Sequence, residues 1–190
     1  MGLVGVLLAA TLVVAAAFGV GCQPAVRTGT ASVAPTQGVV DSGFRPSGPT
    51  ETALVVRIVD GDTIVVRLGG QDRRLRYIGM NTPETVKPNS PVEWFGREAS
   101  DANRALVDGR TVVLEKDVSE TDRFGRLLRY VWLVDGDRWT MVDLELVATG
   151  FAQVETDPPD VRYADRFRAA QRSAREAGVG LWGPSPSSTH

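Results

Sequence analysis

Three short apolar segments separated by turn residues constrain the fold of this chain more than any other feature of its sequence. They are rich in Val, Ile and Leu with interspersed Arg, and they span Ala53–Val59, Thr63–Leu68 and Arg73–Ile78. Asp60-Gly61-Asp62 and Gly69-Gly70 separate them, and Gly and Asp are residue types that favour tight turns between strands. The pattern predicts a three-strand meander.

The sequence that follows predicts helices interleaved with two further strands. Helical spacing of apolar residues and Gly at the expected ends indicate helices at 97–107, 141–148 and 162–177. Strands are expected at 111–114 and 127–133. We therefore expect a β-rich α+β fold, a five-stranded barrel of the OB type packed by three helices. Such barrels commonly bind oligonucleotides or oligosaccharides, and the fold alone does not choose between them.

The N-terminal segment has the composition of an export signal. No charged residue occurs from Gly2 to Gly21, and this apolar run ends at Cys22, the only Cys of the chain. Gly19-Val20-Gly21-Cys22 resembles a bacterial lipoprotein processing site, which would place a lipid on Cys22. An uncleaved membrane anchor and simple secretion, with cleavage after Ala17, are the alternatives. All three place the folded part outside the cytoplasm, in the cell envelope or secreted.

Composition divides the chain into four parts. Residues 1–22 form the signal, lipoprotein or anchor segment, and residues 23–50, dominated by small and polar types, are expected to be a flexible linker. Residues 51–182 form the folded domain, and residues 183–190 a disordered tail.

Composition also excludes several kinds of chemistry. One Cys and one His, His190 at the C-terminus, allow no disulfide within the chain and effectively no zinc site. The formal net charge of -2 provides no long-range positive field that would attract nucleic acid. Any site for a polyanion must therefore be local.

Three polar motifs interrupt the predicted strands. They are Asp60-Gly61-Asp62-Thr63, Arg76 followed after four residues by Asn81-Thr82-Pro83-Glu84, and Asp122-Arg123-Phe124-Gly125-Arg126. Each alone has an ordinary explanation as a hairpin turn, a helix cap or a solvated loop. Their order and spacing, with a closing Gly180-Leu181-Trp182, closely resemble the staphylococcal nuclease (thermonuclease) family over about 130 residues.

The resemblance implies an OB barrel with three helices and calcium-dependent hydrolysis of DNA and RNA that leaves 3′-phosphates. By motif position, Asp62 and Asn81 would be calcium ligands, Thr82 would contribute its backbone carbonyl, and Asp60 would lie in the outer shell. Calcium accepts six to eight hard oxygen ligands, waters among them, so these residue types suit it.

The remaining motif positions imply roles in catalysis. Glu84 would orient or deprotonate the attacking water, and Arg76 and Arg126 would bind the scissile phosphate and offset its growing charge. Arg123 matches a family position that contacts a terminal phosphate.

Three departures modify what the resemblance implies. The domain is acidic where the best-known member is basic, which predicts weaker substrate binding that depends on salt through only a few phosphate contacts. Asn81 stands where the best-known member has Asp, which removes one negative charge and predicts weaker calcium binding. Phe124 replaces a Tyr, and residues 155–160 (ETDPPD) lack the phenols expected near the nucleotide base.

Three functions remain open at this point. The first is a calcium-dependent, sugar-nonspecific nuclease, a monomer that favours single-stranded DNA and RNA and is held to the membrane by its lipid or anchor. The second is a catalytically weak OB-fold module that binds nucleic acid or oligosaccharide. The third is a structural envelope protein.

Overall fold

The computed structural model describes residues 43–85 and 93–184. The predicted export segment with Cys22, most of the predicted linker, and the tail from residue 185 lie outside the described residues. Within the part that the structure describes, no helix is long and apolar enough to cross a membrane.

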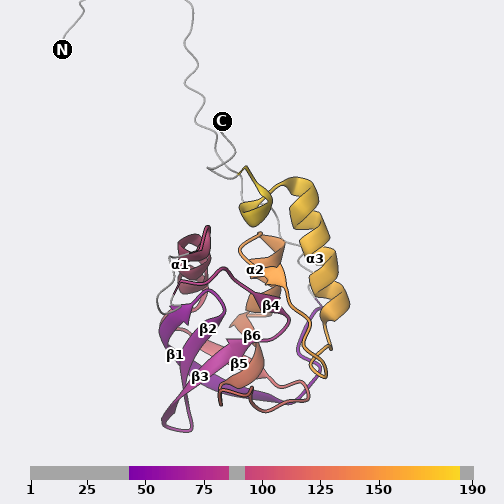
Figure 1. Cartoon of the computed structure of the whole chain (residues 1–190). Helices are drawn as coiled ribbons and strands as arrows, with labels where there is room; N and C mark the ends of the chain where they lie inside the picture. The colour runs from indigo at the N-terminus through magenta and orange to yellow at the C-terminus, as the bar shows by residue number, and fades with distance from the viewer. Residues whose placement is uncertain (1–42, 86–92, 185–190) are drawn as a thin grey trace, which may run out of the picture. The chain divides into compact units, whose positions relative to one another are not determined.

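Five strands form a closed barrel (Figure 1). Its antiparallel meander consists of β1 (Thr50–Asp60), β2 (Thr63–Leu68) and β3 (Gln71–Tyr77). β1 also pairs with β5 (Thr111–Glu115), and β5 pairs with β6 (Leu127–Asp135). Parallel pairing of β3 with β6 closes the barrel, with Arg76 opposite Leu128. This architecture confirms the predicted five-stranded barrel.

Alternation along β3 shows why these residues form a barrel wall. Leu75 and Tyr77 are buried in the core, whereas Arg74 is exposed and Arg76 half-buried on the outer face. Side chains of successive strand residues point to opposite faces, so one face of β3 fills the core and the other carries guanidinium groups.

Three short strands were not anticipated. β7 (Arg138–Met141) extends the sheet beyond β6, and β4 (Met80–Asn81) pairs with β8 (Gln153–Val154) in a separate two-stranded sheet. Strands of two residues are too short for an alternating pattern to reveal them. Because β4 pairs with β8, the residues that follow β8, from Glu155 on, lie next to the second polar motif, which includes Asn81 of β4.

The three predicted helices are present as α1 (Gly96–Val107), α2 (Val142–Ala148) and α3 (Ala164–Ala177), followed by the short helix η1 (Gly180–Trp182). α2 packs against both other helices and against β6, as Figure 1 shows. Phe167 of α3 is fully buried in the core. A Cβ on Gly79 would lie 2.6 Å from the Phe167 ring, so glycine lets the β3–β4 turn pass beneath α3.

The sequence predicted that the folded domain begins at residue 51, but in the structure it begins earlier. The ring of Phe44 packs edge-on against that of Tyr163, with centroids 5.3 Å apart. The backbone N–H of Ser47 donates to the fully buried carboxylate of Glu115 at 2.9 Å. The last residues of the predicted linker are therefore part of the domain, because a buried acid and an aromatic cluster hold them.

Candidate active site

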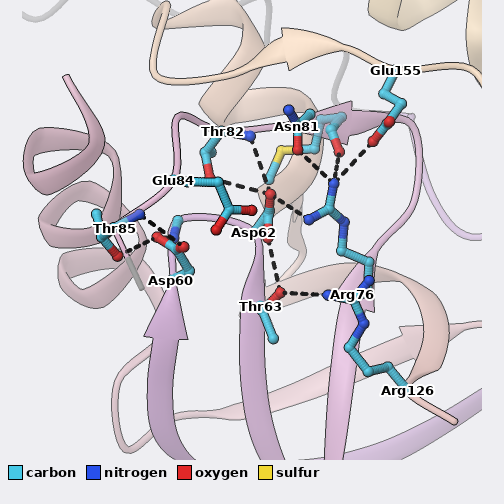
Figure 2. Close-up of polar contacts among 12 residues, drawn as sticks. Asp60, Asp62, Thr63, Arg76, Asn81, Thr82, Glu84, Thr85, Arg126 and Glu155 are labelled. Carbon is cyan, nitrogen blue, oxygen red and sulfur yellow. Dashed lines mark hydrogen bonds and ion pairs between the residues drawn. The ribbon is translucent and has the colours of Figure 1, made fainter. Parts of the chain in front are cut away.

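A hollow of about 900 Å³ lies beside β3 and is lined by residues of the second and third polar motifs. Its walls come from the outer face of β3, the segment after β4, the loop before β6, and residues 155–160. Figure 2 shows the polar contacts around Asp62 and Arg76.

Asp62 is the fixed point of the site. Its side chain is almost completely buried, and Oδ1 accepts a hydrogen bond from the Thr63 hydroxyl at 2.8 Å. Oδ2 accepts hydrogen bonds from the backbone N–H and hydroxyl of Thr82, at 3.1 and 3.2 Å. The first two polar motifs are thus bonded directly to each other.

Gly61 allows this close approach. A Cβ at this position would lie 2.7 Å from the Thr82 hydroxyl oxygen and 2.9 Å from its Cβ. Any larger residue would separate Asp62 from Thr82. The neighbouring Asp60 is also buried, and its Oδ1 accepts a hydrogen bond from the Thr85 hydroxyl at 2.7 Å.

The guanidinium of Arg76 joins side-chain oxygens from three parts of the chain. Nη1 forms an ion pair with Asp62 Oδ2 at 2.6 Å. Nη2 donates to the Asn81 side-chain oxygen at 2.7 Å and to Glu155 Oε2 at 2.9 Å. Charge-assisted bonds of this kind are short and directional, so they fix the position of Arg76.

Glu84 extends toward Asp62 in Figure 2, in a region of excess negative charge. Burial raises the pKa of Glu84, and the negative charges of Asp60 and Asp62 raise it further, while Arg76 opposes them. A raised pKa makes a carboxylate a better proton acceptor than an exposed glutamate.

Arg126 reaches the same place from the loop before β6. Asp122 holds it: Oδ2 accepts from Arg126 Nε at 2.6 Å, and Oδ1 accepts from the Phe124 and Arg126 backbone N–H groups, both at 2.9 Å. Burial alone would raise the Asp122 pKa, but the bonds from Arg126 lower it. Nη1 of Arg126 lies 3.5 Å from the Thr63 hydroxyl, so Arg76 and Arg126 approach neighbouring residues of one turn.

Arg123 lies at the rim of the hollow, separate from this cluster. Its guanidinium is 4.7 Å from the centroid of the Phe124 ring, and 69% of Phe124 is exposed. An exposed ring beside arginines is suited to stacking against a nucleic-acid base.

The predicted metal ligands lie close together, although they do not form a preformed metal cage. Among the residues at 43–85 and 93–184, no three His, Cys, Asp or Glu side chains are arranged to hold a metal ion. Asp62 and Asn81 nevertheless direct oxygens toward one guanidinium, and the effect of Asp60 and Asp62 on the pKa of Glu84 shows concentrated negative charge. A carboxylate and an amide oxygen beside this charge fit a hard cation that keeps several waters.

The structure shows another role for Thr82 besides the predicted one. Its N–H and hydroxyl both donate to Asp62, so it positions the first predicted ligand. Participation of its carbonyl stays a prediction.

Sequence reasoning assigned no role to two carboxylates of the site. Asp122 had a local signal, because an Asp followed three residues later by Gly is typical of a turn capped by the Asp side chain. Glu155 had no such signal in the sequence, because only the pairing of β4 with β8 brings it next to Arg76.

Comparison with known proteins identifies the family. The protein-family model described as "Staphylococcal nuclease homologue" matches residues 74–184 of this chain. This chain belongs to the staphylococcal nuclease family. It is 41% identical to the thermonuclease of Staphylococcus hyicus over 132 residues, which are 70% of this chain and 76% of that protein. The thermonuclease of Staphylococcus intermedius is 40% identical over the same shares of both chains.

A bacillar relative agrees with this assignment. Endonuclease YncB of Bacillus subtilis is 39% identical over 131 residues, 68% of this chain and 60% of that protein. The predicted family and the predicted staphylococcal-nuclease-like barrel with three helices are thus confirmed.

Proposed function

We propose that this member of the staphylococcal nuclease family is a calcium-dependent, sugar-nonspecific nuclease that cleaves DNA and RNA to 3′-phosphate products outside the cytoplasm. The family and its relatives, two thermonucleases and an endonuclease, make the chain a hydrolase of phosphodiester bonds. The single observation that carries the catalytic assignment is the approach of Arg76 and Arg126 to Asp62 and Thr63 in one hollow.

The two arginines are the phosphate-binding groups of this proposal. Both are held by carboxylates, Arg76 by Asp62 and Arg126 by Asp122, so their orientation is set before substrate arrives. Guanidinium groups fixed in this way stabilise the charge that grows on phosphate oxygens in the transition state. Removing one such contact typically slows catalysis by ~10² to 10³.

Glu84 is the proposed general base. Its pKa is raised by burial and by neighbouring carboxylates, and its carboxylate faces the site without accepting a hydrogen bond from any described side chain. It can therefore orient a water and accept its proton as the water oxygen attacks phosphorus and the bond to the leaving oxygen breaks.

Calcium is the proposed cofactor, with Asp62 and Asn81 as its ligands, Thr82 contributing its carbonyl, and Asp60 in the outer shell. A bound calcium would neutralise phosphate charge and lower the pKa of a coordinated water. Because Asn81 carries no charge, we expect a dissociation constant in the range of ~10⁻⁴ to 10⁻³ M, which titration calorimetry would measure.

A single strand is the preferred substrate in this proposal. The exposed Phe124 ring offers a stacking surface that a base in a duplex cannot reach. Export by lipidation at Cys22, by an anchor, or by secretion is supported by the charge-free run that precedes Cys22. A monomer is expected in each case.

One observation favours a second candidate, a catalytically weak OB-fold module that binds nucleic acid or oligosaccharide. Nη2 of Arg76 already donates to Asn81 and Glu155, so an incoming phosphate must displace a bonded oxygen. If these bonds persist, the hollow binds a ligand without activating it.

Cleavage assays distinguish the two candidates. The purified chain is incubated with single-stranded or double-stranded DNA, in calcium or in chelator, beside a Glu84→Gln variant that keeps the side-chain shape. Calcium-dependent cleavage that is lost in the variant supports the nuclease and the role of Glu84 together. Binding without cleavage at millimolar calcium would leave the binding module as the function.

A further inference from the structure

Arg74 is an exposed basic residue of the hollow to which the catalytic proposal gives no role. It lies on β3 two residues before Arg76, on the same outer face, and both line the hollow. Within the described parts of the chain, Arg74 forms no hydrogen bond or ion pair, whereas Arg76 contacts three side-chain oxygen groups and the Met80 carbonyl. Its guanidinium is therefore available to an external anion.

Arg74 and Arg76 form a row of two guanidinium groups on the outer face of β3, and their neighbours on that face do not extend it. Asp72, the next residue on the same face, binds Arg67 across the strand pair, with Oδ1 2.8 Å from Nε and Oδ2 3.2 Å from Nη2. The row thus ends in a neutralised pair. Beyond Arg76, on the other side, lie Asn81 and Glu155.

Spacing along the strand suits adjacent phosphates of one polynucleotide. Residues two apart on a strand are separated by about 6.6 Å. This is comparable to the distance between neighbouring phosphates of an extended single strand, and flexible arginine side chains accommodate the remaining difference. Two such contacts along one line orient a strand, which a single contact cannot do.

Acidic residues on the wall formed by residues 155–160 disfavour a path of the nucleic-acid strand along that wall. Glu155 and Asp157 are exposed acidic residues of that wall, and the carboxylate of Glu155 is bonded to Arg76 at the end of the β3 pair. Phosphates are repelled from carboxylates, so the strand backbone is directed toward the β3 side.

We propose that Arg74 binds the phosphate next to the scissile one, so that β3 holds two consecutive phosphates of a single-stranded substrate. This inference rests on the proposed function for the assignment of the scissile phosphate to Arg76. It makes the protein selective for polynucleotides over substrates that contain one phosphodiester.

The test compares Arg74→Ala with Arg73→Ala. Arg73 lies on the same strand, carries the same charge and does not line the hollow, so its variant controls for net charge. Binding of a labelled single-stranded oligonucleotide is measured by fluorescence anisotropy at several salt concentrations in chelator, which prevents cleavage. Thermal melting of both variants verifies that they fold, since Arg74 is exposed whereas Arg73 is half-buried on the other face of β3.

We expect Arg74→Ala to weaken binding by up to about fivefold and to reduce the slope of log K against log salt by about 0.7, the value for one single-strand phosphate contact. The slope of Arg73→Ala should match that of the wild type. Equal slopes for Arg74→Ala and wild type, or an equal loss in both variants, would overturn the inference.

A cleavage assay separates this inference from the proposed function. In calcium, the ratio of kcat/KM for the oligonucleotide to that for a dinucleoside monophosphate should fall in Arg74→Ala. A protein that shows the Arg74-dependent salt slope but cleaves neither substrate would end the nuclease proposal and leave the phosphate site standing.

Discussion

Asp143, at the start of α2, gives a quantitative prediction about pH and stability. Its side chain is fully buried, and Oδ2 accepts a hydrogen bond from the Val131 N–H at 2.8 Å. Oδ1 has no hydrogen-bond partner among the described residues. Burial raises the pKa of Asp143 well above its ordinary value of 3.8, and the bond from Val131 only partly opposes this.

The sign of the effect follows from this raised pKa. Between the ordinary pKa and the folded-state pKa, the unfolded chain has lost the Asp143 proton while the folded chain retains it. Folding then requires a proton to be taken up, so the free energy of unfolding falls as pH rises through this window, by up to about 1.4 kcal/mol per pH unit. Below the ordinary pKa this cost is absent.

Asp143→Asn removes this titration while keeping an oxygen that can accept the Val131 bond. Relative to wild type, the variant should gain stability as pH rises from about 4 to about 7, by at most about 4 kcal/mol over the three units. Urea unfolding of both proteins across this range measures the difference. Asp101→Asn, on the exposed face of α1, controls for the change in net charge.

A stability difference between Asp143→Asn and wild type that stays constant across this pH range would refute the reasoning. Asp143 would then be ionised in the folded protein, with its charge stabilised by groups that the described contacts do not include.

Three further predictions concern the arginines. Arg126→Ala should lower kcat for single-stranded DNA by ~10² to 10³ with little change in melting temperature, and unchanged turnover would remove this residue from the mechanism. Glu155→Gln should lower KM by up to about fivefold, because the exposed carboxylate no longer competes with phosphate for Arg76; a raised KM in steady-state kinetics would show instead that Glu155 helps substrate bind. Arg129→Met should lower the free energy of unfolding by about 1–3 kcal/mol in urea titrations, because loss of the buried guanidinium leaves its carboxylate and carbonyl partners without a hydrogen bond. A change near zero would mean that solvent replaces these bonds.

The sequence predicted the barrel well because its strands alternate clearly. In β3, apolar Leu75 and Tyr77 alternate with Arg74 and Arg76, and the structure places the two pairs on opposite faces. The three polar motifs could also be found in the sequence, because the polar residues of each lie within five residues or in one strand and the loop that follows it. Local patterns of this kind survive folding unchanged.

Features that depend on contacts between distant residues escaped prediction. Glu155 is 79 residues from Arg76, and only the β4–β8 pairing brings them together. Phe44 stands in a stretch of small and polar residues that resembles a linker, yet it packs between Trp132 and Tyr163. A local sequence pattern does not indicate which distant element a side chain will contact, so these contacts were found only in the structure.

The parallel β3–β6 pairing couples catalysis to the completion of folding. Arg76 lies in the paired register itself, while Arg126 immediately precedes β6. A chain that has formed only the β1–β2–β3 meander carries Asp62 and Arg76, but Arg126, the second arginine proposed to bind phosphate, is not yet held beside them. Closing a long loop carries an entropic cost that precedes the gain from the contacts it brings together. The chain therefore brings Arg76 and Arg126 together only when the barrel closes, so on the proposed mechanism a partly folded molecule has no assembled centre with which to cut nucleic acid.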